Sequence, residues 1–74
     1  MSIKDKLEFC VKHGMTITYI ANRMSVEPST LSKWLHGQKG ITHKNENLLE
    51  QTLITIVKEM QAALLGEDEY GIVN

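Results

Sequence analysis

Positively charged side chains cluster in one stretch of the sequence, the residues between Glu27 and Glu46, which contain no acid. Three lysines and two histidines fall inside it: Lys33, Lys39, Lys44, His36 and His43. Side chains of this kind can bind phosphate groups, and a local basic excess is typical of surfaces that bind nucleic acids. The net charge of −1 hides this pattern because three of the nine acids are consecutive, at positions 67–69.

Other kinds of chemistry lack the residues that they need. The single cysteine, Cys10, cannot form a disulfide within the chain, and cysteine and histidine do not occur at the spacing of a four-ligand metal site. There is no glycine-rich phosphate loop and no pair of carboxylates beside a histidine. We therefore expect no catalysis, no metal and no cofactor, and interpret Cys10 as a small buried apolar residue.

Helical periodicity dominates the chain, whose 74 residues suffice for one small domain. We predict an all-α fold with four helices, over about Ile3–Lys12, Ile17–Met24, Pro28 to Leu35 or His36, and His43–Leu65. Thr16 and Thr42 are suitable N-caps, and Pro28 suits the first position of a helix. We expect a domain over residues 1–66 and a mobile acidic tail over 67–74. No apolar run is long enough for a signal peptide or a membrane span, so a soluble, cytoplasmic protein is expected.

The second and third helices have the pattern of a helix-turn-helix unit, with a small residue where two helices meet and apolar residues that fill the angle between them. Six positions agree with this pattern: Ile20, Ala21, Met24, Val26, Leu31 and Trp34. Trp34 is accordingly interpreted as a core residue and not as a base-stacking platform. The alternative is that a small helical bundle offers one alanine and five apolar residues by chance.

Two segments, 14–21 (GMTITYIA) and 26–37 (VEPSTLSKWLHG), resemble the Cro/lambda-repressor-like (Xre-type) helix-turn-helix domains. The resemblance covers about residues 3–60 and implies sequence-specific binding to an operator, with residues 28–35 in the major groove. Three positions depart from the family pattern. Ser25 stands where glycine is usual, Ile17 where a polar phosphate contact is frequent, and Glu27 where serine or threonine often caps the helix.

The resemblance places the base contacts at Pro28, Ser29, Ser32 and Lys33. Phosphate contacts are expected from Thr18, Thr30, His36, Lys39, His43 and Lys44, with Arg23 as a further candidate. Three alternatives stay open: a phosphate contact for Lys33, a hydrogen bond to the helix backbone for Thr30, and no function at all for His36.

The last helix carries an apolar seam at spacings of 4, 3, 4 and 3, formed by Leu49, Leu53, Ile56, Met60 and Ala63. At about 34 Å, this helix is long for so small a domain. We predict a homodimer through Leu53, Ile56, Val57, Met60 and Leu64, which reads a palindromic double-stranded DNA operator with half-sites about 34–36 Å apart. The alternative is that the whole seam closes the core of a monomer.

The leading hypothesis is therefore a small DNA-binding transcription regulator of the phage or mobile-element type, a repressor that occludes a promoter. The rival hypothesis is a protein-interaction modulator of the antirepressor, antitoxin or anti-defence type. It keeps the helix-turn-helix fold but binds another protein through the last helix or the acidic tail. The near-neutral net charge, Ile17 and Glu27 favour the rival, whereas the acid-free stretch favours DNA binding.

Overall fold

The computed structural model describes residues 1–66 as four helices: α1 (Ile3–Lys12), α2 (Ile17–Met24), α3 (Pro28–Leu35) and α4 (His43–Leu65). The predicted all-α class is confirmed, and the bounds of all four helices match the predicted ones. The segment 67–74, expected to be a mobile acidic tail, lies outside the described residues. None of the described helices is long and apolar enough to cross a lipid bilayer.

Hydrogen bonds from side chains explain where three of the helices begin. The hydroxyl groups of Thr16 and Thr42 each accept a hydrogen bond from the amide three residues later, at 3.1 and 3.2 Å, as expected for N-caps. At the start of α1 the bonds are reciprocal: the Asp5 amide donates to the Ser2 hydroxyl, and the Ser2 amide donates to the Asp5 carboxylate. These bonds satisfy amides that the first turn of a helix leaves unpaired.

Nine apolar side chains form the core, and every helix contributes at least one of them. They are Leu7, Ile20, Ala21, Met24, Leu31, Trp34, Leu49, Leu53 and Ile56. Trp34 is thus a core residue, as predicted, although its indole Nε1 has no hydrogen-bond partner among the described residues. Cys10 is half-buried against this core.

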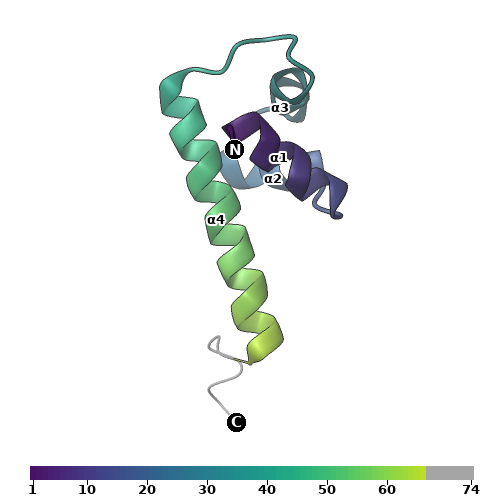
Figure 1. Cartoon of the computed structure of the whole chain (residues 1–74), viewed down its shortest axis with the longest axis vertical. Helices are drawn as coiled ribbons and strands as arrows, with labels where there is room; N and C mark the ends of the chain where they lie inside the picture. Colours follow the sequence, from purple (N-terminus) through teal and green to yellow (C-terminus); the bar gives the residue numbers. More distant parts are fainter. Residues whose placement is uncertain (67–74) are drawn as a thin grey trace.

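Helix α4 is longer than the group of helices that it supports. Figure 1 shows α1, α2 and α3 gathered around one half of α4, while the other half extends away from them. The described chain is accordingly elongated, with extents of 47 × 21 × 20 Å. Ile56 is the last buried residue of α4. We call α1–α3 with the first part of α4 the head, and residues Val57–Leu65 the overhang.

Candidate nucleic-acid interface

The corner between α2 and α3 is set by a single residue with an unusual backbone conformation. Ser25 adopts φ 60° and ψ 39°, the left-handed region that glycine usually occupies at such a position. The Val26 amide then donates to the Ala21 carbonyl at 3.0 Å, which reverses the chain toward α3. Ala21 is completely buried, as the close approach of two helices requires. Serine at this position, where glycine is usual, therefore raises the conformational free energy of the turn, but the turn still reverses the chain between α2 and α3.

The four residues predicted to contact bases lie on the side of α3 that faces away from the core. Leu31 and Trp34 are buried and fix the orientation of the helix. Ser29 and Lys33 are exposed and one turn apart, so they share the face opposite these two residues. Pro28 and Ser32 are half-buried beside them. The structure thus brings the predicted set together on one surface of one short helix.

Thr30, predicted as a phosphate contact, is half-buried. At 100° per residue it lies on the other flank of α3 from Ser32. No hydrogen bond of its hydroxyl to the helix backbone is present among the described contacts, so the alternative local role gains no support.

The acid-free stretch is bounded by two carboxylates that behave differently. At the far end, Glu46 Oε1 lies 3.4 Å from Nδ1 of His43, so part of the positive potential of His43 is used within the chain. At the near end, Glu27 is the N-cap of α3 but makes no capping hydrogen bond with its side chain. Its exposed carboxylate is therefore free, at the end of the helix where the backbone dipole is positive. Glu27 can accept a hydrogen bond from a base, such as the amino group of cytosine.

The loop after α3 carries the other predicted phosphate contacts. The Gln38 amide donates to the Lys33 carbonyl at 2.8 Å, and Gly37 adopts φ +70°, which together reverse the chain at the end of the helix. His36 and Lys39 are exposed on this reversal. Lys44 is exposed in the first turn of α4. These side chains are unobstructed in the monomer.

Lys4 belongs to the same surface, although no sequence pattern indicates it. Its Nζ atom lies 3.5 Å from the position that a Cβ at Gly37 would occupy. This placement follows from the packing of α1 against α3 and leaves no trace in the spacing of residues along the chain. Lys4 is therefore an additional candidate for a phosphate contact.

Two predicted phosphate contacts lie on α2, and they differ in whether the side chain is already paired within the chain. Thr18 is exposed in the first turn of α2. Arg23 is not free: its guanidinium donates to both carboxylate oxygens of Glu59 on α4, at 2.7 and 2.8 Å, and to the Tyr19 hydroxyl at 3.0 Å. These bonds raise the pKa of Arg23 and lower that of Glu59. The phosphate contact of Arg23 stays a prediction, and it would have to compete with the ion pair to Glu59.

The predicted dimer residues fall into two groups. Leu53 and Ile56 are buried in the core of the monomer, with 5% and 1% of their surface exposed. Their place in the predicted interface is therefore corrected: the head needs them to close its own core. Val57, Met60 and Leu64 are exposed by 48%, 53% and 85%. The seam along α4 thus serves the core in its first half and remains uncovered in its second half.

Within residues 1–66, no group of three or more histidine, cysteine or acidic side chains could hold a metal ion. Burial raises the pKa of the Cys10 thiol, which lowers its thiolate fraction and hence its reactivity. The exposed side chains on the outward face of α3 are the hydroxyl group of Ser29 and the ammonium group of Lys33.

Searches against models of protein families, curated proteins and solved structures found no match to this chain. The resemblance to helix-turn-helix domains of the Cro/lambda-repressor type therefore rests on the sequence of segments 14–21 and 26–37 and stays a prediction.

Proposed function

We propose that this protein is a sequence-specific DNA-binding transcription regulator that acts as a repressor by occluding a promoter. In this proposal α3 enters the major groove, where Pro28, Ser29, Ser32 and Lys33 read base edges. Lys39 and Lys44 bind phosphates on either side of the loop and hold the helix in register. A dimer places two such helices on the two halves of a palindrome.

One observation supports the proposal above all: the stretch of the sequence without acids, residues 28–45, supplies both the exposed outward face of α3 and the exposed basic residues that follow it. Ala21 is fully buried at the corner, and Leu31 and Trp34 fix the orientation of α3. The residues that this orientation leaves outside are small hydroxyl side chains and a lysine. Small hydroxyl residues permit close approach to a groove wall, and lysine binds phosphate or guanine.

The test is a selection of bound duplexes from a random DNA library, followed by titrations at several salt concentrations. Each phosphate contact contributes about −0.9 to the slope of log K against log [salt]. Lys39→Ala and Lys44→Ala should weaken binding to all sequences alike and each flatten this slope by nearly one unit. Ser29→Ala and Ser32→Ala should instead change which sequences are selected.

Gln51→Glu is the matched control, because it lowers the net charge by the same one unit at an exposed position on α4 beyond the acid-free stretch. If it weakens binding as much as Lys39→Ala does, the effect reflects net charge and not a surface around α3. If no sequence is enriched even at low salt, the DNA-binding proposal is wrong.

A second function, a modulator that binds another protein, is favoured by a different observation. Glu27 leaves an uncompensated carboxylate at the start of α3, and Arg23 is occupied by Glu59. Both features weaken attraction to DNA. Absence of DNA enrichment together with a stable complex between this protein and a purified transcription regulator or nuclease would favour this function.

A further inference from the structure

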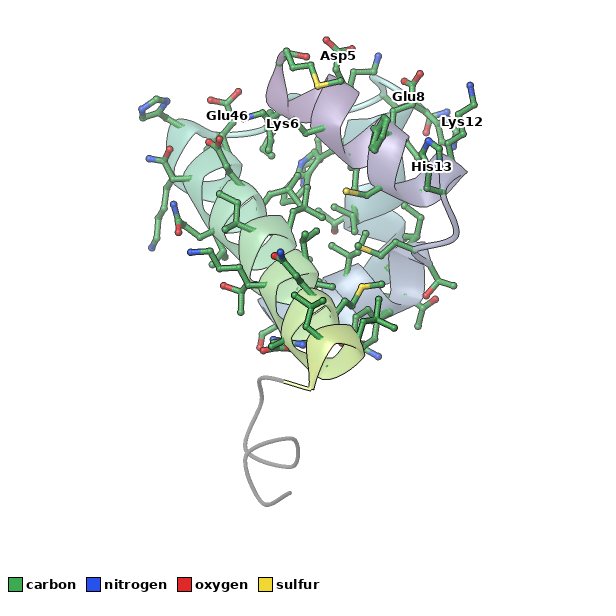
Figure 2. All side chains as sticks on the ribbon, turned by 60° about the horizontal axis from the view of Figure 1, so that its bottom comes forward. Asp5, Lys6, Glu8, Lys12, His13 and Glu46 are labelled. Atoms are coloured by element: carbon green, nitrogen blue, oxygen red, sulfur yellow. The ribbon has the colours of Figure 1, made fainter. Side chains whose placement is uncertain are left out.

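An open apolar groove of about 960 Å³ separates the overhang from the head. One wall is the end of α1 and the start of α2, including Phe9, Met15 and Tyr19, and the other wall is the overhang, including Met60 and Leu64. A smaller hollow of about 430 Å³ continues it along α4 and shares Phe9, Cys10 and Val57. Figure 2 shows α1 beside α4, with the charged side chains of Asp5, Glu8 and Lys12 pointing away from α4. The groove itself is lined mostly by apolar residues, with His13, Thr16 and Gln61 as its polar ones.

The end of the overhang carries no charge on any face. After Glu59, the sequence from Met60 to Gly66 contains only apolar residues, one glutamine and the glycine. A helix that is apolar all round is normally buried on all sides, yet Leu64 is 85% and Leu65 59% exposed. The last attachment of α4 to the head is the ion pair between Glu59 and Arg23. Beyond that point α4 has no buried residue within residues 1–66, and Ala62 alone is half-buried.

We propose that the groove is filled by the overhang of a second copy of this chain, and that the two copies exchange overhangs about a two-fold axis. The inference rests on the dimer of the proposed function and specifies how that dimer is built. Leu64 and Leu65 of each copy lie against Phe9, Met15 and Tyr19 of the other. The contact is self-complementary, because each copy supplies both a groove and a helix end.

The exposed apolar area matches what such a dimer needs. Six large residues bound the groove and are about half exposed or more: Phe9, Tyr19, Val57, Met60, Leu64 and Leu65. At about 200 Å² for a fully exposed large side chain, they leave roughly 700 Å² uncovered. A stable interface buries about 800 Å² on each partner, whereas a monomer rarely exposes a patch above a few hundred.

Charge fixes the two α4 helices as antiparallel. Gly66 is followed in the sequence by Glu67, Asp68 and Glu69. Parallel helices would bring both sets of acids to the same end of the dimer, where they repel. Antiparallel helices separate the two sets and bring the negative end of each α4 dipole toward Lys12 in the last turn of the partner's α1.

Disulfide trapping tests this arrangement without DNA, so that its failure is distinct from failure of the proposed function. The first chain is the wild type with a size tag, which keeps Cys10 in the groove. The second chain carries Cys10→Ala and Leu64→Cys. Because burial raises the pKa of the Cys10 thiol, the mixture is oxidised at alkaline pH. We expect the mixed disulfide to be the main covalent product.

The control chain carries Cys10→Ala and Gln51→Cys, a position on α4 that is exposed and bounds neither hollow. It should give no mixed product. The second chain alone should also give none, because antiparallel helices hold the Cα atoms of the two Leu64→Cys positions beyond the ~7 Å limit for a disulfide. A covalent dimer of the second chain with itself would show parallel helices and overturn the proposal. So would sedimentation of the wild type as a monomer at tens of micromolar.

Discussion

Ser25 is the one residue other than glycine with a positive φ among residues 1–66, and it forms the turn on which the α2–α3 corner depends. The left-handed conformation costs a residue with a Cβ about 1–2 kcal/mol, whereas glycine adopts it freely. Ser25→Gly should therefore raise the free energy of unfolding by up to about 1 kcal/mol, after the entropy that glycine loses on folding. Urea denaturation measures this. Ser25→Ala, which retains the Cβ, is the control and should give no gain; a loss with glycine would contradict the turn geometry.

Substitutions at Ala21 and Trp34 test the packing of the α2–α3 corner in two ways: one adds side-chain volume to the core and the other removes it. Ala21→Leu places a larger side chain at a fully buried contact and should cost about 1–3 kcal/mol. Trp34→Ala should cost about 3–5 kcal/mol. Trp34→Phe should cost less, because the indole Nε1 that it removes has no hydrogen-bond partner within the described chain.

Asn22→Leu is the control for Ala21, since its neighbouring side chain is exposed. Chemical denaturation of all four variants separates the outcomes. Changes below about half a kcal/mol at both buried sites would be typical of surface positions and would mean that α2 and α3 do not pack as described.

At the scale of the elements, α2 and α4 are joined by the ion pair between Arg23 and Glu59. Hydrogen bonds from Arg23 lower the pKa of Glu59 in the folded protein. The stabilisation that this pair provides is therefore complete above the ordinary glutamate pKa and is lost as the pH falls through the lowered value. Glu59→Gln should reduce the melting temperature at neutral pH, and the difference from the wild type should vanish in strong acid.

Thermal melts at neutral and strongly acidic pH measure this difference. Glu8→Gln is the matched control, because Glu8 lies on the outer face of α1 and makes no ion pair among the described contacts. A difference between Glu59→Gln and the wild type that persists unchanged in acid would show that the carboxylate of Glu59 does not act through its charge.

The bounds of the helices could be predicted because they depend on residues close together in the sequence. Thr16 and Thr42 cap amides three residues away, and glycines or a left-handed Ser25 end the helices. Contacts between residues that are far apart in the chain left no comparable pattern in the sequence. Arg23 and Glu59 are 36 positions apart, and nothing in their spacing distinguishes them from free surface charges.

The candidate site was predictable to the same extent. The face of α3 that carries Ser29 and Lys33 followed from helical periodicity, since Leu31 and Trp34 had to be buried. The position of Lys4 beside Gly37 depends on how α1 crosses α3 and could not be read from the sequence. Which part of the α4 seam is buried likewise depends on where the head ends. The apolar repeat continues unchanged past that point, so the sequence does not indicate it.

At the scale of the whole molecule, the proposed dimer links self-association through the overhang to the proposed DNA binding. Met60→Glu with Leu64→Glu places charges at exposed positions and should leave the head folded, while it abolishes the dimer and tight binding to the operator. Sedimentation, circular dichroism and DNA titration of the same sample measure the three properties. Gln51→Glu with Thr55→Glu is the matched control, with the same spacing and added charge on exposed positions of α4 outside both hollows. Tight palindrome binding by a monomeric Met60→Glu, Leu64→Glu protein would refute the link.

The length of α4, 23 residues, also sets the distance between the two heads of the antiparallel dimer. Twice the length of the helix, less the shared overhang of about 13 Å, makes the two α4 helices together roughly 55 Å long. The head segments of α4, residues 43–56 of each copy, are about 21 Å long and therefore lie about 34 Å apart from centre to centre. The selected operators should accordingly have half-sites about one turn of DNA apart, at 34–36 Å. Eleven residues inserted between Ile56 and Val57 keep the helical register but move the overhang about 16 Å away from Phe9, Met15 and Tyr19. The groove between head and overhang is then lost, so we expect the insertion to abolish both the dimer and tight binding to these operators.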